Sequence, residues 1–400
     1  MFSRRTEWNL APNRLTLAHQ EALRSGKKIL DLTVSNPTRA GIEYNARAIL
    51  EALSRPQALD YDPQPKGLRS ARQAVAEYYC SCGSDILVRQ SAKVAVDPES
   101  LILTTSTSEG YSFVFRLLCN SGDEILVPKP SYPLFDFLAD LQDVKLVPYS
   151  LIYDHGWQID FHSLERAVGE RSRGIVLVHP NNPTGSYVSA PERKHLNEIC
   201  RDRELALIVD EVFLDYALYG ENEQSFGTND GALTFTLSGI SKISALPQMK
   251  LAWIAVSGPE ADADAAMQRL EVIADTYLSL NAPVQLATSV LLGQRKTIQP
   301  QLMRRVRANL AELDRQLAAQ KACSRLEIQG GWYAILRIPV TRSDEDFSIQ
   351  LLQSTSVYVH PGHFYDFPSD GYLVVSLITP EDQFRQGVSS MLRFGNEASG

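Results

Sequence analysis

Short apolar runs recur along the first two-thirds of the chain, and helix-like segments separate them. The runs are apolar at consecutive positions and too short for helices, which is typical of strands buried on both faces of a sheet. They are "LILTT" from Leu101, "EILVP" from Glu124, "GIVLVH" from Gly174, "LALIVD" from Leu205, "LTFTLS" from Leu233 and "LAWIAVS" from Leu251. Helix-like segments lie at 108–118, 132–141, 161–168 and 190–203. This alternation predicts an α/β fold with a mostly parallel sheet covered by helices.

The pattern changes after about residue 261. Long charged helical stretches run to about Ala322, with a break expected at Pro300, and two strand-like segments and a last helix from Pro380 follow. The two strand-like segments are "WYAILRIP" and "YLVVSLIT". The first 45 or so residues contain a helix and an extended piece ending in "SNPTRAG". We expect a large domain over residues 46–292 and a smaller α+β domain built from both chain ends, residues 1–45 and 293–400.

Composition and charge narrow the class of protein. The hydrophobic fraction of 44% and the charged fraction of 22% are those of a globular chain. The formal net charge of -8 disfavours nucleic acid or an anionic membrane surface as the main partner, because either requires a basic face. No apolar run approaches the roughly 20 residues of a membrane span. The first residues, "MFSRRTEWNLAPNR", lack the apolar core of a signal peptide.

The cysteines indicate neither a disulfide framework nor a metal site. The chain has 5 of them, an odd and scattered set. We therefore expect a reducing, cytoplasmic location. Cys80 and Cys82 lie close together, but no second His or Cys pair follows nearby, so we expect no metal there.

Polar residues follow five of the six apolar runs. The segments are "STSEGY", "KPSYPLF", "PNNPTG", "DEVFLDY" and "SGISK". Because ligands of open parallel sheets bind beyond the carboxyl ends of the strands, we expect these residues to form one site. It would combine a hydroxyl-rich loop, an aromatic ring, an asparagine, an acid and a lysine. Thr105, Ser106 and Thr107 at a helix start would provide an anion site.

Each of these features also has an ordinary structural interpretation. "TSTSEG" is also a helix N-cap with Glu109 in a capping box, and "NNPTG" is also a plain turn. Asp210 ends an apolar strand, where it is either a helix N-cap or a buried acid in need of a cation. Tyr132 fits a packed aromatic, and Lys242 fits an exposed loop lysine. Only the combination, in this order and at strand ends, indicates one chemistry.

The chain resembles the fold-type I pyridoxal-phosphate enzymes of the class I/II aminotransferase family, within the aspartate aminotransferase superfamily. The similarity covers nearly the whole chain and rests on six segments. They are "LDLTVSNPT", "YDPQPKGLRSAR", "PSYPLF", "NNPTG", "VDEVF" and "SGISK". The resemblance implies a seven-stranded type of sheet, pyridoxal 5'-phosphate as cofactor, and a homodimer. It also implies amino-group transfer between an amino acid and a 2-oxo acid.

The resemblance implies a role for each residue around the cofactor ring. Lys242 would form the Schiff base and later move the proton. Asp210 would pair with the pyridinium nitrogen, Asn182 would hydrogen-bond the phenolic oxygen, and Tyr132 would stack on the ring. Elementary chemistry agrees, because an aldehyde cofactor requires a primary amine and its ring nitrogen stays protonated beside a buried carboxylate.

The resemblance also implies a set of residues around the cofactor's phosphate. Within the subunit these are Thr105, Ser106, Thr107, Ser238, Ser241 and Lys250. Tyr61 would reach the phosphate of a neighbouring subunit, so the active unit would be a homodimer with Tyr61 donated across the interface. A phosphate dianion requires several donors and at least one cation.

The sequence departs from the family pattern at four positions. Lys250 replaces an arginine, which exchanges a two-pronged donor for a point charge. Phe213 stands where a tyrosine usually bonds the phenolic oxygen, although Tyr216 is nearby. Gly239 replaces a serine. Val374 stands where the family usually has the arginine that binds the substrate carboxylate.

A substrate carboxylate therefore requires another partner. Arg39 in "SNPTRAG" is the first candidate, although it also fits a surface turn, and Arg337 in "AILRIP" is the second, although it also fits a solvated strand. Ser35 and Asn182 would add neutral contacts. We predict an aminotransferase that uses a Lys242 Schiff base. The alternatives are a decarboxylase, lyase or racemase with the same cofactor, or a non-catalytic cofactor-binding protein.

Overall fold

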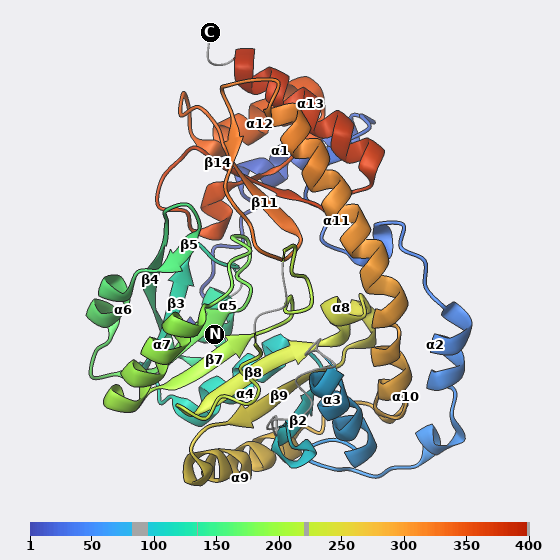
Figure 1. Cartoon of the computed structure of the whole chain (residues 1–400), viewed down its shortest axis with the longest axis vertical. Coiled ribbons are helices and arrows are strands. Elements are labelled where there is room, and N and C mark those ends of the chain that lie inside the picture. The colour runs from blue at the N-terminus through green and yellow to red at the C-terminus, as the bar shows by residue number, and fades with distance from the viewer. Residues whose placement is uncertain (82–94, 134, 220–223, 398–400) are drawn as a thin grey trace.

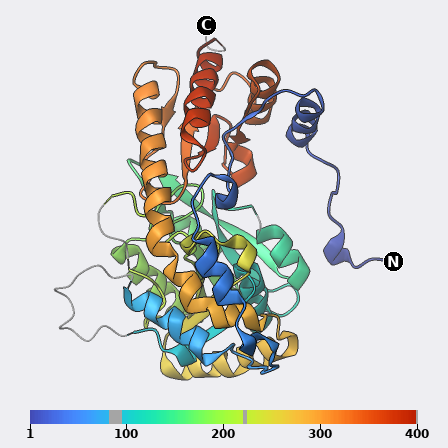
Figure 2. The ribbon, with the colours of Figure 1, turned by 90° about the vertical axis from the view of Figure 1, so that its right-hand side faces the viewer.

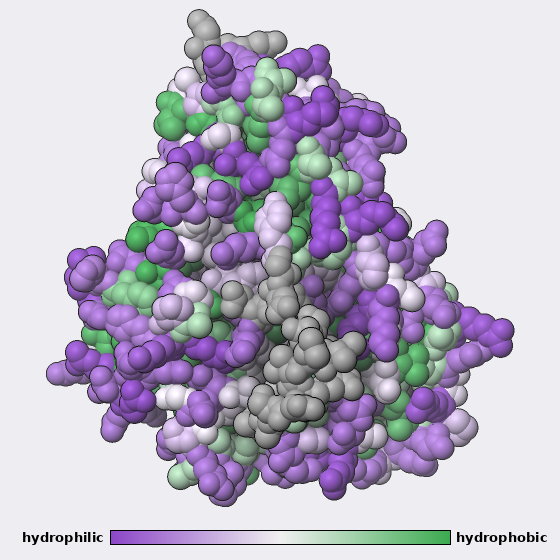
Figure 3. Space-filling model, viewed as in Figure 1, coloured by the Kyte–Doolittle hydropathy of each residue, from purple (hydrophilic) through white to green (hydrophobic). Residues whose placement is uncertain are grey.

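The computed structural model describes residues 1–81, 95–133, 135–219 and 224–397, so Cys82 lies outside the described residues. A large sheet with its helices occupies the lower part of Figure 1, and a smaller sheet with the C-terminal helices occupies the upper part. Hydrophilic residues cover most of the face seen in Figure 3. Within the described residues, no helix is long and apolar enough to cross a membrane.

The large sheet has eight strands in the order β2-β9-β8-β7-β6-β3-β4-β5. Their bounds are β2 Leu101–Thr104, β3 Glu124–Lys129, β4 Lys145–Tyr153, β5 Trp157–Ile159, β6 Ser172–Val178, β7 Ala206–Asp210, β8 Thr234–Gly239 and β9 Ala252–Ser257. The pairs from β8 to β4 are parallel, whereas β9 and β5 run antiparallel to their neighbours. The α/β prediction is confirmed, and all six apolar runs are strands. The sequence did not reveal β4 and β5, because β4 alternates between exposed and partly buried residues.

Helices cover both faces of this sheet. They are α2 Ala46–Leu53, α3 Arg69–Ser81, α4 Thr107–Leu118, α5 Phe135–Gln142, α6 Phe161–Ala167, α7 Ala190–Arg203, α9 Glu260–Tyr277 and α10 Ala282–Gly293. Alternate residues of one strand enter different hydrophobic clusters. Ile208 packs with residues of α4, α5 and α9, whereas Leu207 and Val209 pack with residues of α6 and α7. Burial on both faces explains the continuous apolar runs.

Both chain ends contribute to the smaller α+β part. A four-stranded antiparallel sheet has the order β10-β11-β14-β13, and β1 pairs in parallel with β12. The bounds are β1 Leu30–Asp31, β10 Ser324–Arg325, β11 Tyr333–Arg337, β12 Val357–Tyr358, β13 His360–Pro361 and β14 Tyr372–Ser376. The helices are α1 Arg14–Arg24, α12 Asp344–Thr355 and α13 Glu381–Glu397. The exact domain boundaries at residues 46 and 293 stay predictions.

One helix, α11 Arg295–Leu317, runs from the large part to the small part (Figures 1 and 2). It contains Pro300, so the break predicted there is wrong. The interior proline costs about 3 kcal/mol. Ile298, Leu302 and Val306 of this helix are fully buried, and each such side chain contributes about 1.5–3 kcal/mol. Burial of this face therefore outweighs the proline, and the discontinuity falls at Gln294, between α10 and α11.

Candidate active site

Lys242 lies in α8 Ile240–Ile243, a single helical turn that follows β8 without a linker. Gly239, the last residue of β8, lies close to the neighbouring strand β9. A Cβ at Gly239 would come within 2.9 Å of both the Leu251 carbonyl oxygen and the Ala252 Cβ. This close approach gives a physical reason for glycine at a position where a serine is usual.

The Lys242 amine faces two aromatic rings and one carboxyl group. Nζ lies 5.5 Å from the centre of the Phe213 ring and 5.1 Å from that of Trp332. Burial lowers the pKa of Lys242 to about 8, and the charge of Asp210 acts in the opposite direction. Burial also raises the pKa of Asp210 to about 6, although Lys242 stabilises its charged form. Near neutral pH Asp210 is therefore mostly ionised, and a larger fraction of Lys242 is free amine than for an exposed lysine.

Asp210 is held at the carboxyl end of β7 by two hydrogen bonds. The Tyr111 hydroxyl donates to Oδ2 at 3.3 Å, and the Val212 backbone N–H donates to Oδ1 at 3.1 Å. Tyr111 is buried on α4 and was not predicted as a site residue. Its spacing of one helical turn from Thr107 was the available signal, because i and i+4 residues share a helix face.

Tyr132 and Asn182 follow β3 and β6, beyond the carboxyl ends of strands in the same sheet. Asn182 is buried, and its Oδ1 finds no hydrogen-bond partner in the described part of the chain. Tyr132 is 42% exposed. Burial raises the pKa of Tyr132, and the nearby charge of Asp210 adds to this effect. An amine, an acid, an amide with unused hydrogen-bonding capacity and an open aromatic ring are a donor set that fits the pyridoxal ring.

The loop before α4 forms the expected N-cap, but Glu109 bonds Thr105 instead of the N-cap residue, so it does not close a capping box. Ser106 is the N-cap, and its hydroxyl accepts from the Glu109 N–H at 3.1 Å. The Glu109 carboxylate accepts from the N–H of Thr105 at 2.7 Å and from its hydroxyl at 3.1 Å. The first backbone N–H groups of a helix, here those of Thr107 and Ser108, have no acceptor inside it. These N–H groups are therefore unpaired within the helix at its positive end, as the predicted anion site requires.

The remaining predicted phosphate residues differ in how they are placed. The Ser238 hydroxyl is buried and donates to the Glu211 carbonyl at 3.4 Å, whereas Ser241 is half-buried. Lys250 is exposed in a left-handed backbone conformation. Tyr61 is 85% exposed. Neither of these two side chains forms a hydrogen bond or ion pair with a described residue.

Three side chains from distant segments hold the backbone that carries Lys242. The Tyr216 hydroxyl donates to the Lys242 carbonyl at 2.6 Å. Gln299 of α11 donates to the Ile243 carbonyl at 2.9 Å, and the Tyr44 hydroxyl donates to the Ala245 carbonyl at 2.8 Å. Tyr216 is therefore engaged with the lysine backbone. No local sequence motif predicts these three hydrogen bonds, because the donors are far apart in the sequence from the residues that accept them.

The candidate substrate residues do not gather into a visible anion site. Ser35 and Arg39 are exposed after β1, and their side chains form no hydrogen bond or ion pair with a described residue. Arg337 is exposed at the end of β11, with its guanidinium 5.4 Å from the centre of the Tyr153 ring and 6.0 Å from that of Tyr372. Val374 is buried.

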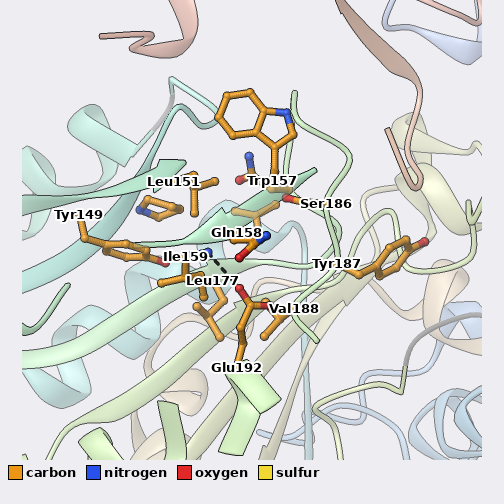
Figure 4. A pocket seen from close by; sticks show the side chains of 13 residues that line it. Tyr149, Leu151, Trp157, Gln158, Ile159, Leu177, Ser186, Tyr187, Val188 and Glu192 are labelled. Atoms are coloured by element: carbon orange, nitrogen blue, oxygen red, sulfur yellow. Dashed lines mark hydrogen bonds between the residues drawn. The ribbon is translucent and has the colours of Figure 1, made fainter. Parts of the chain in front are cut away.

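A separate pocket lies between the β4–β5 hairpin and the segment that follows β6 (Figure 4). Across it, the Ile159 N–H donates to Glu192 Oε1 at 2.9 Å, shown as a dashed line. Its lining is mostly apolar, with Trp157 and Tyr149 as its large rings. It includes Asn181 but none of the predicted site residues, so it adjoins the Lys242 site without being part of it.

Comparison with known proteins identifies the family of the chain. The chain matches the family "Aminotransferase class I and II" over residues 27–387. It is 27% identical over 392 residues to the glutamate-pyruvate aminotransferase AlaA of Haemophilus influenzae, covering 94% of this chain and 93% of that protein. It is 29% identical over 372 residues to an alanine aminotransferase of Mycobacterium bovis, covering 89% of this chain and 83% of the relative.

Solved structures show the same fold. An Escherichia coli aminotransferase superposes with a TM-score of 0.84 at 26% identity, covering 100% of this chain and 98% of that one. An alanine aminotransferase from Pyrococcus furiosus superposes with a TM-score of 0.87 at 22% identity, covering 99% and 100%. The chain therefore belongs to the class I and II aminotransferase family, and it is a pyridoxal-phosphate-dependent aminotransferase.

Proposed function

We propose that Lys242 is the residue that holds the cofactor and moves the proton in this aminotransferase. The observation that carries the proposal is the placement of its amine, which lies against Phe213 and Trp332 and interacts with the Asp210 carboxylate. A pKa lowered to about 8 by burial leaves a useful fraction of free amine near neutral pH, as a nucleophile and a general base require.

The cofactor site divides into a ring part and a phosphate part. Bound pyridoxal phosphate supplies an electron-withdrawing ring that stabilises negative charge at the substrate's α-carbon. Asp210 would keep the ring nitrogen protonated, Asn182 would donate to the phenolic oxygen, and Tyr132 would cover one ring face.

The phosphate would be bound by the first N–H groups of α4 and the hydroxyl-rich residues at its start. Ser241 and Lys250 lie on the opposite segment, after β8. The Ser238 hydroxyl would support this region through its bond to the backbone. The residues in this proposed group are Thr105, Ser106, Thr107, Ser238, Ser241 and Lys250.

In the proposed mechanism Lys242 Nζ removes the proton from the substrate's α-carbon. The protonated amine would then give this proton to the second carbon of the 1,3-proton transfer, and its pKa of about 8 suits both roles because it lies near the working pH. Phe213 and Trp332 would keep bulk water from the amine, and Tyr216 would hold the lysine backbone through its carbonyl. Phe213 takes no hydrogen bond in this scheme, which distinguishes the site from the usual tyrosine arrangement.

The names of the relatives suggest the substrates. We infer that the enzyme moves an amino group between small 2-amino acids and 2-oxo acids, with alanine and glutamate as the first donors to test. Ser35 and Arg39 remain predicted substrate contacts on the segment after β1.

We also infer a cytoplasmic homodimer. Tyr61 supports the dimer, because its ring is 85% exposed and therefore accessible to a second subunit. The described cysteines are free thiols, which is consistent with a reducing compartment.

The test is a coupled assay of the purified holoenzyme. We expect L-alanine and 2-oxoglutarate to give equimolar pyruvate and glutamate. Release of CO2, ammonia or a D-amino acid without a new amino acid would favour the decarboxylase, lyase or racemase alternative. Cofactor binding with no reaction from a broad donor panel would favour a binding protein.

A further inference from the structure

One face of the small sheet carries a valine where the family pattern has a cation. Val374 on β14 stands directly opposite Ile335 on β11 and His360 on β13. Directly opposed residues of an antiparallel pair point to the same face, with Cβ atoms about 4.5–5.5 Å apart. A carboxylate brought to a water-poor face requires a paired donor. A donor at one of the two positions opposite Val374, Ile335 or His360, would be close enough to replace the missing arginine.

His360 occupies one of these two opposed positions. Its Nδ1 lies 3.1 Å from the Tyr365 hydroxyl, on the 3-10 helix Gly362–Tyr365 that directly follows β13. The imidazole also packs against Tyr358 and Phe364, with ring centres 5.9 and 5.6 Å away. Histidine gains a positive charge more readily near neutral pH than any other side chain. The other opposed residue, Ile335, has no donor.

Tyr365 connects His360 to the residues around Lys242. The Ser131 N–H donates to the Tyr365 carbonyl at 3.0 Å, which ties this helix to the loop that carries Tyr132. Burial raises the pKa of Tyr365, and its interactions with the Tyr333 and Tyr132 hydroxyls raise it further. These three phenols therefore lie within electrostatic range of one another. Because Tyr132 also interacts with Asp210, the group extends from the Asp210 side of the site to His360.

The arginines proposed from the sequence are less well placed. Arg337 stands opposite Tyr372, at the outer end of β11, and rests against aromatic rings. The Arg39 side chain is exposed and pairs with no described residue. Among the described residues, no hydrogen bond, ion pair or ring contact joins either arginine to the group formed by Tyr132, Tyr333, Tyr365 and His360. Within this group only the histidine is able to become a cation.

We propose that His360, oriented by Tyr365, binds the carboxylate of the amino-acid substrate in place of the arginine that Val374 has replaced. This inference rests on the proposed function and names the residue that determines specificity for 2-amino acids. The imidazolium would donate through Nε2 to the carboxylate. Tyr365 would fix the ring through Nδ1.

A histidine anchor makes substrate binding depend on pH. Burial lowers the pKa of His360 to about 4, and Asp31 of β1 acts in the opposite direction. The other titratable groups facing it are Tyr365 and Tyr358, with His19 of α1 stacked on Tyr358. An arriving carboxylate favours the imidazolium and raises its pKa, so binding takes up a proton. Affinity for the carboxylate therefore falls as pH rises, by up to about tenfold per pH unit while the complex stays protonated.

The experiment uses propanoate, a carboxylate without an amino group, as the probe of the holoenzyme. Titration calorimetry at pH 7 in two buffers of different ionisation enthalpy gives affinity and proton uptake. We expect the His360→Gln variant to bind propanoate about 10- to 100-fold more weakly than the wild type. Binding to this variant should also take up about one proton fewer. His363→Gln, an exposed histidine three residues along, is the matched control and should behave as wild type.

Kinetics separate an anchor from a structural role. His360→Gln should lower kcat/KM for L-alanine about 10- to 100-fold, while the slow reaction with ethylamine, which has no carboxylate, changes less than about twofold. Tyr365→Phe should show the same pattern with a smaller loss of kcat/KM for L-alanine. If His360→Gln does not fold, Tyr365→Phe serves as the test variant. Equal losses for both amines, or unchanged propanoate binding, would overturn the proposal. So would a loss confined to Arg39→Gln.

Failure of the proposed function has a different signature. It would appear as a wild-type enzyme that transfers no amino group from L-alanine or from any other donor. Propanoate binding by His360 could still be measured in that case, because the calorimetric test does not depend on turnover.

Discussion

The cofactor end of the site and its substrate end differ in how their charges are paired. At the cofactor end, Lys242 and Asp210 face each other at the carboxyl ends of adjacent parallel strands, and each stabilises the other's charge. At the substrate end, Val374 offers no charge, and His360 is held neutral by burial. The cofactor is constant across a family whereas substrates vary. Under the proposals made above, this enzyme would keep the common chemistry and change how the substrate is held.

The largest expected effect is at the cofactor end. Lys242→Ala should lower transamination by about 10⁴-fold or more, because it removes both the nucleophile and the general base. Lys194→Ala is the control. Lys194 is exposed on α7, and its ion pair with Glu198 is long, with 4.0 Å between Nζ and Oε1. Far-UV circular dichroism should be unchanged in both variants. Substantial turnover by Lys242→Ala would remove the basis of the comparison.

Gly239→Ser tests whether the geometry beneath Lys242 forbids the usual serine. The new Cβ would meet the Leu251 carbonyl oxygen and the Ala252 Cβ at 2.9 Å, and overpacking of this kind costs about 1–3 kcal/mol. Urea unfolding should show a lower midpoint with an unchanged slope. Gly293→Ala is the matched control, because no atom lies within 4 Å of the added Cβ. A Gly239→Ser variant as stable as wild type would show that the close approach is not limiting.

Phe213→Tyr should make the cofactor end resemble the usual pattern more closely. A phenol donor beside the cofactor's phenolic oxygen would stabilise its anion, so the visible chromophore should lose its proton at lower pH. The shift should be about one pKa unit, the scale of one hydrogen bond to a charged group. Spectral titration of the holoenzyme measures it. Tyr216 already donates to the Lys242 carbonyl. No shift would therefore mean that a group other than Tyr216 fills that place.

The smallest expected effect concerns the amine of the cofactor-free enzyme. Its pKa of about 8 predicts that reductive labelling of Lys242 by a small aldehyde rises with pH and is half-maximal near pH 8. An ordinary exposed lysine would require about pH 10.4. Asp210→Asn removes the charge that favours the ammonium form, so the midpoint should move to lower pH. A midpoint that stays or rises would show that the two groups are not coupled.

The sequence predicted that Asp210 and Lys242 lie close together, because they lie at the carboxyl ends of two strands that are consecutive in the chain and adjacent in the sheet. Asp210 and Lys242 each come directly after an apolar run, and parallel strands bring such positions to one edge. The sequence could not predict the Tyr216 and Gln299 contacts with the lysine backbone, since these join segments that only tertiary packing brings together.

The residues at the proposed substrate end could not be predicted from the sequence for a similar reason. The position of His360 opposite Val374 depends on strand register, which no local pattern specifies. The break predicted at Pro300 failed because burial along α11 outweighs the local cost of proline.

Reduction of the holoenzyme with borohydride, followed by mass mapping of the peptides, tests the central claim most directly. We expect a yellow protein that loses its colour and carries the reduced cofactor on Lys242 alone. Asp210→Asn should still be labelled at Lys242, because the amine remains in place. A label on Lys250 or on any other lysine would contradict the assignment of the site.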